Sequence, residues 1–277
     1  MRRNHHDSRN EPLKTPCGKR SKPIFAVLGM TFLACAPQYA LAGGTVATEG
    51  SNGIAVVELF HSEGCSSCPP ADDLIGKLAL DSRKQKVPVY VLSHHVDYWD
   101  SLGWKDPYGS KTATARQTAY VKTLKINGIY TPCAIINGTR VMPFQNVGKT
   151  VNDELAKPSV AQISISVPAA TSNELTVSVA VTHAPAGSSV YLAVVERGLV
   201  VEVRAGENKG KTMRHDNTVR SSTSAKLPAN GVASLTTALP SDLKAANATV
   251  IVLVQDAATM RVLGASAVDM EPSPPSR

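Results

Sequence analysis

The chain has 277 residues, which is enough for one large domain or two ordinary domains. Hydrophobic residues make up 43% of it and charged residues 18%, a composition that excludes an intrinsically disordered protein. No apolar run reaches the roughly 18 residues of a membrane-spanning helix, so we expect no integral membrane span. The net charge is +7, but residues 1–42 hold seven basic and two acidic residues, which leaves only +2 for the remainder. This near balance argues against a nucleic-acid partner.

The first 42 residues have the pattern of a secretory signal peptide. Residues 1–23 are polar and basic, residues 24–36 form an apolar run, and Ala-Leu-Ala stands at 40–42. The sequence therefore predicts cleavage near Ala42 and an exported protein, either periplasmic or secreted. A lipoprotein signal that uses Cys35 is the alternative. Export would place the mature chain where pairs of thiols form disulfides.

Residues 53–158 alternate between patterns of buried strands and of amphipathic helices. The apolar run at 54–60 is typical of a strand buried on both faces, and Ala71, Ile75 and Leu78 follow it at helical spacing. The expected elements are a strand at 54–60, a helix around 71–79, a strand at 87–92, a helix at 110–124, a hairpin at 133–142 and a helix around 147–155. This order is that of the thioredoxin fold, so we predict an α/β thioredoxin-like domain over residues 53–158.

From residue 159 onward, short strands that alternate apolar and polar residues replace the helices. The expected strands are 161–167, 174–182, 190–196, 199–204, 218–226, 232–238, 249–256 and 262–268. Their number and spacing predict a separate all-β domain, an immunoglobulin-like sandwich, over residues 159–270. The remaining residues, 271–277, are rich in proline and serine, and we expect a disordered tail.

Cys65 and Cys68 form a Cys-x-x-Cys motif between the first strand and the first helix of the mature chain. Two intervening residues allow both sulfurs to lie on one helical turn, within disulfide distance. The positive end of the helix dipole favours a thiolate at Cys65, so this residue is the expected nucleophile. Cys68 would resolve the mixed disulfide that Cys65 forms with a partner.

Other readings of the motif stay open. The two cysteines and a histidine could bind copper or another metal, or the pair could be a structural disulfide. Cys133 is a third cysteine of the mature chain; it is either a small buried side chain or a third thiol near the pair.

Two further segments carry candidate site residues. Thr131-Pro132 stands where a thioredoxin fold places a cis-proline opposite the cysteines. Residues 93–108 are rich in histidine, aspartate and aromatic residues; in this loop His95 or Asp97 could assist proton transfer, or its histidines could bind metal. Alternatively, the loop is a packed lid. The polar segment 204–217 is either a solvated hairpin loop or a contact with the first domain or with an anionic partner.

Several long stretches resemble one known family. They are residues 58–60, 64–72 (GCSSCPPAD), 95–107 (HVDYWDSLGWKDP), 130–132 and 206–208. These stretches resemble the domain-of-unknown-function 1223 family of exported bacterial proteins, in the thioredoxin-like superfamily, over residues 53–270. The resemblance implies a thioredoxin-like domain with a β-rich C-terminal part, and it implies no established activity.

The leading hypothesis is thiol–disulfide exchange through Cys65 and Cys68, with Pro132 shaping the site and Thr131, His95 and Asp97 supporting it. We expect no cofactor, because electrons would pass between sulfurs, and the expected partners are thiols or disulfides of exported proteins. The alternatives are a copper or other metal carrier and a non-catalytic envelope protein with a structural disulfide. Neither the direction of electron transfer nor the oligomeric state follows from the residues.

Overall fold

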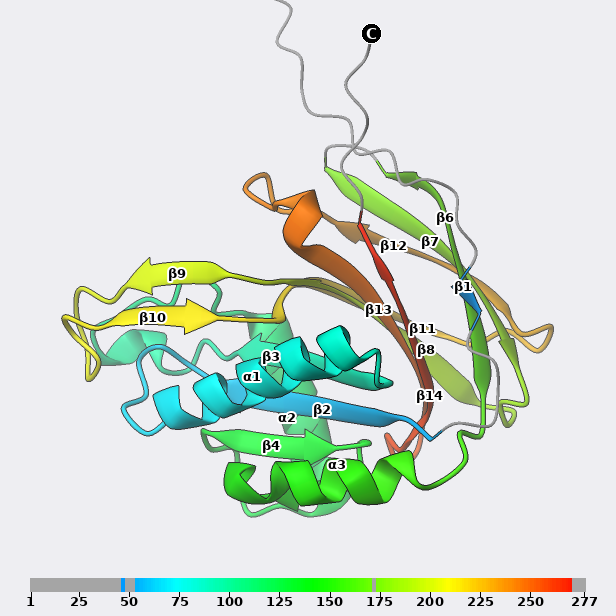
Figure 1. Ribbon diagram of the computed structural model, residues 1–277, viewed down its shortest axis with the longest axis horizontal. Coiled ribbons are helices and arrows are strands. Elements are labelled where there is room, and N and C mark those ends of the chain that lie inside the picture. Colours follow the sequence, from blue (N-terminus) through cyan, green and yellow to red (C-terminus); the bar gives the residue numbers. More distant parts are fainter. Residues whose placement is uncertain (1–45, 48–52, 171–172, 271–277) are drawn as a thin grey trace, which may run out of the picture. The chain divides into compact units, whose positions relative to one another are not determined.

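An eight-stranded mixed sheet runs through the part of the chain that the computed structural model describes, residues 46–47, 53–170 and 173–270 (Figure 1). In spatial order its strands are β14 (Val262–Asp269), β13 (Ala248–Asp256), β8 (Ser188–Glu196), β11 (Thr218–Lys226), β3 (Val89–His95), β2 (Ala55–His61), β4 (Cys133–Ile136) and β5 (Arg140–Met142). The pairs β2–β3 and β3–β11 are parallel, and the other pairs are antiparallel. The predicted signal peptide and the predicted tail lie outside the described residues.

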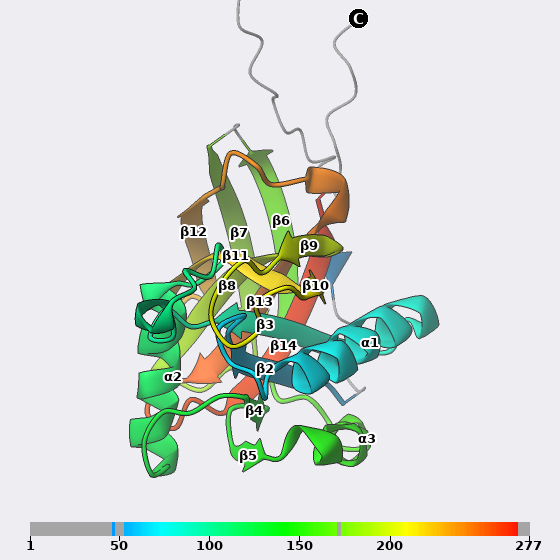
Figure 2. The ribbon, with the colours of Figure 1, turned by 90° about the vertical axis from the view of Figure 1, so that its left-hand side faces the viewer.

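Helices cover both faces of the β3–β2–β4 part of this sheet. The helices are α1 (Pro69–Gln85), α2 (Lys111–Leu124) and α3 (Val147–Leu155), with short 3-10 turns η1 (Asp100–Leu102), η2 (Phe144–Asn146) and η3 (Ala245–Asn247). Figure 2 shows α2 on one side of the sheet and α1 and α3 on the other. Side chains of a strand alternate between faces, so Val57 and Leu59 pack under α1 and α3, whereas Phe60 packs under α2. No helix of the described residues is long and apolar enough to cross a membrane.

A second sheet covers the other end of the large one. Its strands are β1 (Val46–Ala47), β6 (Gln162–Ala170), β7 (Glu174–Thr182) and β12 (Val232–Ala238). Alternate residues of β6 and β7, such as Ile165 and Val177, meet Leu192 of β8 and Val252 of β13 in one apolar core. The polar residues between them face outward, which explains the period-two pattern of the sequence.

The predicted fold class is wrong. We expected a thioredoxin-like α/β domain followed by a separate immunoglobulin-like sandwich, but one sheet crosses the expected boundary at residue 158. Thr218 of β11 pairs with Ser93 of β3, and the Ser93 N–H donates to the carbonyl of Asn217 at 2.9 Å. The described chain is therefore mostly β-structure around a shared sheet. Periodicity shows which face of a strand is buried, but it carries no information about which distant strand lies beside it.

A two-stranded hairpin, β9 (Leu199–Glu202) and β10 (Thr212–His215), stands apart from both sheets. Among the described residues, its strands pair only with each other. Strand β10 contacts α1, and Figure 1 shows the hairpin near the first turns of that helix. Its turn, residues 203–211, belongs to the polar segment for which the sequence left two readings open.

Candidate functional site at the cysteine corner

Cys65 and Cys68 lie between the end of β2 and the beginning of α1, at the strand-to-helix corner that the sequence predicts. Cys68 is the N-cap residue of α1, and Pro69 and Pro70 fill the first helical positions, where a missing N–H leaves no bond unmade. Cys65 lies in the turn before the helix rather than on its first turn. Its Sγ is 2.6 Å from that of Cys68, yet both are free thiols.

The two thiols differ in acidity because their surroundings differ. The Cys68 thiol, which faces the Cys65 sulfur, lowers the pKa of Cys65 to about 6; burial opposes this shift, and the Ser67 hydroxyl, 3.2 Å away, adds to it. Burial and the neighbouring Cys65 raise the pKa of Cys68 well above its usual range. At neutral pH, Cys65 is therefore the thiolate and Cys68 the thiol.

Both cysteines are buried, with exposed fractions of 1% for Cys65 and 0% for Cys68. Ser66 and Ser67, which lie between the two cysteines, are exposed, so the turn reaches the surface while its sulfurs face inward. The reagent or protein that reacts with Cys65 must therefore wait for a local movement of the covering residues.

Thr131 and Pro132 lie next to the pair. The Thr131–Pro132 peptide bond is cis, as predicted, and the Thr131 carbonyl lies 3.9 Å from the Cys65 sulfur. The indole N–H of Trp99 donates to the Thr131 hydroxyl at 2.8 Å, which ties the loop of residues 93–108 to this side of the corner. That loop also crowds Gly64, where an added Cβ would lie 3.1 Å from Cβ of Trp99.

Asp106 fixes the segment that leads into the cysteines. Its Oδ2 accepts the backbone N–H of Glu63 at 2.9 Å and faces Nδ1 of His95 at 2.8 Å. Burial works against the ionised form of Asp106, but the His95 imidazole and the backbone donors hold its pKa below the usual range. Asp106 therefore acts as an anionic anchor for the turn.

The turn of the β9–β10 hairpin contacts the same segment from another direction. The Asn208 amide donates to the carbonyls of Glu63 at 2.7 Å and of Cys65 at 2.9 Å. Oε2 of Glu207 accepts the backbone N–H of Ser66 at 2.8 Å. Of the two readings of segment 204–217, contact with the first half of the chain is the one that the structure bears out.

Beneath the corner lies a group of buried imidazoles and carboxylates, which we name the cysteine-side cluster. Its members are His61, Glu63, Asp72, His95, Asp106 and His215, and each is at most 3% exposed. His215 of β10 bridges two carboxylates, with Nδ1 2.5 Å from Oδ2 of Asp72 and Nε2 3.0 Å from Oε1 of Glu63. The cluster thus joins the hairpin to α1 and to the cysteine turn.

The cluster holds its histidines in different charge states. Burial opposes the imidazolium of His215, but its bonds to Asp72 and Glu63 outweigh burial and raise its pKa to about 10. Burial and repulsion by His95 lower the pKa of His61 to about 3, so its ring is neutral. At neutral pH, His215 is a buried cation between two anions.

A second buried group, the α2-side cluster, lies on the opposite face of the sheet. It consists of Glu58, His94, Arg116, Tyr120 and Gln255. The Arg116 guanidinium of α2 donates hydrogen bonds to both carboxylate oxygens of Glu58, at 2.5 and 2.8 Å. Its central carbon lies 3.8 Å from the ring centroid of Tyr191. Burial opposes the Glu58 anion, yet Arg116 and His94 hold its pKa well below the usual range.

Glu63, His95 and Asp106 offer donor atoms within 4.8 Å of one another, a spacing that metal ligands can have. Both oxygens of Glu63 already face protein donors, His215 and the Trp104 indole. Asp106 likewise takes donors on both oxygens. Nε2 of His95, in contrast, is buried without a hydrogen-bond partner among the described residues, so the group offers one free nitrogen and four oxygens that already accept hydrogen bonds.

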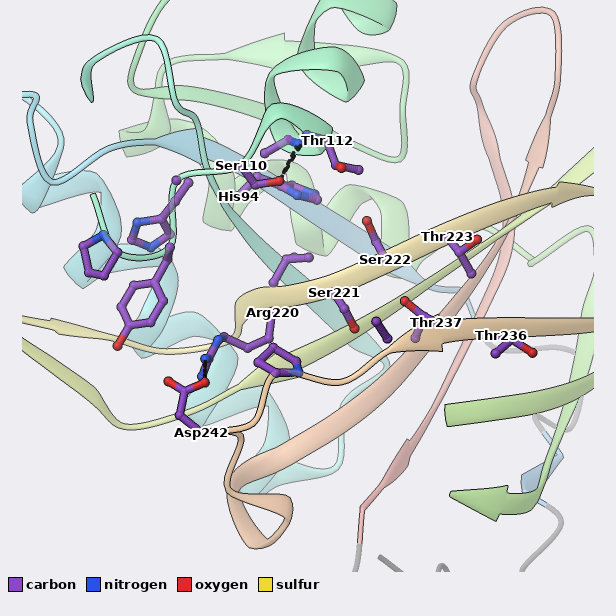
Figure 3. A pocket seen from close by; sticks show the side chains of 18 residues that line it. His94, Ser110, Thr112, Arg220, Ser221, Ser222, Thr223, Thr236, Thr237 and Asp242 are labelled. Atoms are coloured by element: carbon purple, nitrogen blue, oxygen red, sulfur yellow. Dashed lines mark hydrogen bonds and ion pairs between the residues drawn. The ribbon is translucent and has the colours of Figure 1, made fainter. Parts of the chain in front are cut away.

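A polar cavity of about 670 Å³ opens between the start of α2 and strand β11 (Figure 3). Hydroxyl side chains, among them Ser110, Ser222 and Thr237, line it, and Arg220 is paired there with Asp242. No cysteine lines this cavity, but His95 of the cysteine-side cluster does, so the cavity borders that cluster without reaching the sulfurs.

The three remaining predicted residues, His95, Asp97 and Cys133, lie in different surroundings. His95 belongs to the cysteine-side cluster through Asp106. Asp97 instead accepts the Thr114 hydroxyl at 2.6 Å, which ties its loop to α2. Cys133 packs with Phe60 and Tyr120 under α2, whereas α1, which follows the cysteine pair, covers the opposite face of the sheet.

The fold and the corner define a class of protein: a mixed sheet with a Cys-x-x-Cys turn at the end of one buried strand. A family model described as "Protein of unknown function (DUF1223)" matches residues 56–255, and the chain belongs to that family, as its motifs predict. No curated protein matches.

Two solved structures are similar to the chain. A crystal structure of a protein from Agrobacterium tumefaciens shares 29% sequence identity, covers 82% of this chain and 99% of its own, and superposes with a TM-score of 0.56. A domain of the outer membrane lipoprotein Omp28 from Porphyromonas gingivalis shares 15% identity over 42% of this chain and 92% of its own, with a TM-score of 0.28.

Proposed function

We propose that this protein exchanges thiols and disulfides with other proteins through Cys65 and Cys68. The observation that carries the proposal is the contrast between two adjacent thiols at a strand-to-helix corner, one acidic with a pKa of about 6 and one held protonated. This division of roles is what a nucleophile and a resolving thiol require.

The exchange balances without a cofactor. The Cys65 thiolate attacks one sulfur of a partner disulfide, and the other partner sulfur leaves as a thiolate. Cys68 then gives its proton to the departing thiolate and attacks the Cys65 sulfur. The second partner sulfur leaves as a thiolate and takes a proton from water, so the partner is released as a dithiol and a Cys65–Cys68 disulfide remains. Two electrons pass to the partner in this direction, and the reverse sequence oxidises a partner dithiol.

The partners we propose are exported proteins, because the N-terminal segment has the pattern of a secretory signal. An oxidising compartment would supply disulfides on which such a pair could act. Since Cys65 is 1% exposed, exchange in this proposal begins with a local opening of the corner, and we expect it to be slower than exchange by an exposed thiol of the same pKa.

Trapping variants test the proposal. Reduced full-length Cys68→Ser, incubated with a peptide disulfide, should accumulate a mixed disulfide at Cys65, because the resolving thiol is gone. Cys65→Ser should accumulate much less, since Cys68 is protonated and fully buried. Mass spectrometry of the peptide that contains both positions measures both outcomes. If neither variant forms a mixed disulfide at any pH from 6 to 9, the proposal is wrong.

The burial of both sulfurs favours a second candidate, a disulfide that locks the corner and takes no part in exchange. The reduction potential of the pair distinguishes the two. A potential below roughly −300 mV supports the structural lock, and a higher one supports exchange.

A further inference from the structure

The hairpin turn is built to hold the cysteine segment. Asn208 is fully buried, and its amide group donates to two carbonyls that flank Gly64, those of Glu63 and Cys65, the latter 143 residues earlier in the chain. The Lys211 ammonium donates to Oδ1 of Asn208 at 2.9 Å, so the side chain is engaged at both ends. These bonds fix the two peptide planes that set the position of the Cys65 sulfur.

Glu207 acts on the next peptide. Its carboxylate accepts the N–H of Ser66, the first backbone donor after Cys65, and this bond lowers the pKa of Glu207 itself. Backbone N–H groups ahead of a helix stabilise a thiolate, as that of Ser67 does here. The carboxylate thus removes one such donor and places a negative charge one peptide away from the sulfur.

The hairpin is the outer end of a ribbon that starts in the large sheet, because the Leu199–His215 pair continues the register of the Glu196–Thr218 pair of β8 and β11. Beyond the sheet, β9 and β10 pair only with each other among the described strands, so the contacts with the cysteine segment hold the outer part of the ribbon. Its other anchors also end on the cysteine segment or its neighbours. His215 bridges Glu63 and Asp72, and Gly206 lies against Trp104, where an added Cβ would be 3.0 Å from the Trp104 Cβ.

We infer that Asn208 and Glu207 are positioning residues: while they contact residues 63–66, they keep Cys65 buried and its thiol less reactive. Movement of the β9–β10 hairpin away from this segment would therefore activate the thiol. The inference deepens the proposed function and rests on it for its biological meaning. Its physical content, control of Cys65 by a distant hairpin, is measurable without any exchange partner.

The first test changes a charge and leaves the fold intact. Glu207 is exposed, and Glu207→Gln keeps an acceptor for the Ser66 N–H while it removes the negative charge. We expect the pKa of Cys65, followed by thiolate absorbance, to fall by roughly half a unit, about a threefold change in the acid constant. Glu202→Gln is the matched control, because it removes the same charge from an exposed position on β9.

The second test releases the turn. Asn208→Asp keeps the size of the side chain and an oxygen for Lys211, but it loses both donors and faces two carbonyls with an anion. We expect Cys65 to react with a bulky maleimide about tenfold faster than in the native chain, because two buried hydrogen bonds no longer hold the segment. Lys209→Ala, in the same turn with an exposed side chain, should react at the native rate.

Equal effects of Glu207→Gln and Glu202→Gln on the thiolate titration would overturn the role of Glu207. Labelling of Asn208→Asp no faster than that of Lys209→Ala would overturn the role of Asn208. If that variant does not fold, Asn208→Ala, which removes both donors without adding an anion, replaces it, and labelling at the Lys209→Ala rate has the same meaning. A shifted pKa in Glu207→Gln, together with no mixed disulfide in Cys68→Ser, would keep this inference and reject the proposed function.

Discussion

The two faces of the β2–β3 pair carry buried polar clusters of opposite character. On the α2 side, Arg116 supplies a permanent charge that locks Glu58 between a helix and the sheet. On the cysteine side, the cation is the His215 imidazolium, whose charge depends on pH, and it holds the hairpin and the cysteine turn together. The first cluster is therefore a fixed joint, whereas the second is a joint that weakens when His215 loses its proton.

The largest effect on stability should come from removing the Arg116–Glu58 ion pair of the fixed joint. Arg116→Met leaves the Glu58 carboxylate buried without its guanidinium, and we expect the free energy of unfolding to fall by about 3–5 kcal/mol. Adding Glu58→Gln should restore part of that loss, because the stranded charge is then gone. Urea denaturation measures both, with the exposed Lys122→Met on the same helix as the control. A loss below about 1 kcal/mol would show that this cluster is not the stronger joint.

The adjustable joint should respond to pH. The pKa of His215 is raised from its unfolded value near 6.5 to about 10, so its contribution to stability is fully present below about pH 6.5 and is lost as the pH rises toward 10. The groups that face it are Asp72 on α1, Glu63 on the cysteine turn, and the rings of His61, His95 and Tyr108.

His215→Asn removes this titration. We expect it to destabilise the protein by a few kcal/mol at pH 6 and by much less at pH 10, measured by urea denaturation at both. His183→Asn, at an exposed position, should show no such convergence. A difference between His215→Asn and the native chain that stays constant from pH 6 to pH 10 would contradict a cationic His215.

The smallest effect on stability should come from Cys133, which packs under α2 with Phe60 and Tyr120. We expect Cys133→Ala to cost about 1 kcal/mol of stability, the scale for loss of a small buried side chain. The trapping of mixed disulfides by Cys68→Ser should be unchanged in this background. A clear change in trapping would show that the third thiol communicates with the corner across the sheet.

Much of the local structure was predictable. The apolar run at 54–60 corresponds to β2, the helical spacing of Ala71, Ile75 and Leu78 to α1, the expected helix at 110–124 to α2, and the period-two segments to most of the C-terminal strands. The cis bond before Pro132 was also predicted. These features depend on neighbours in the sequence, which is why pattern and turn chemistry suffice for them.

The pairing of the two halves was not predictable in the same way. No local signal says that Thr218 should lie beside Ser93, or that His215 should meet Glu63 and Asp72, because these contacts join residues more than a hundred positions apart. Strand β10 was missed since Arg214 and Thr212 make it read as a polar loop. The sequence shows only that His215 follows a polar turn with two glycines; its burial is visible only in the structure.

The arrangement of the hairpin also has a consequence for biogenesis. Glu207, Asn208 and His215 leave the ribosome more than 140 residues after the residues around the cysteines that they contact. Until they emerge, Glu63 and Asp72 have no cation between them, and the cysteine turn lacks its hydrogen bonds to Glu207 and Asn208. A nascent or truncated chain that stops before residue 207 therefore lacks these contacts to the segment of the two thiols, and the contacts are complete only after residue 215 has been synthesised.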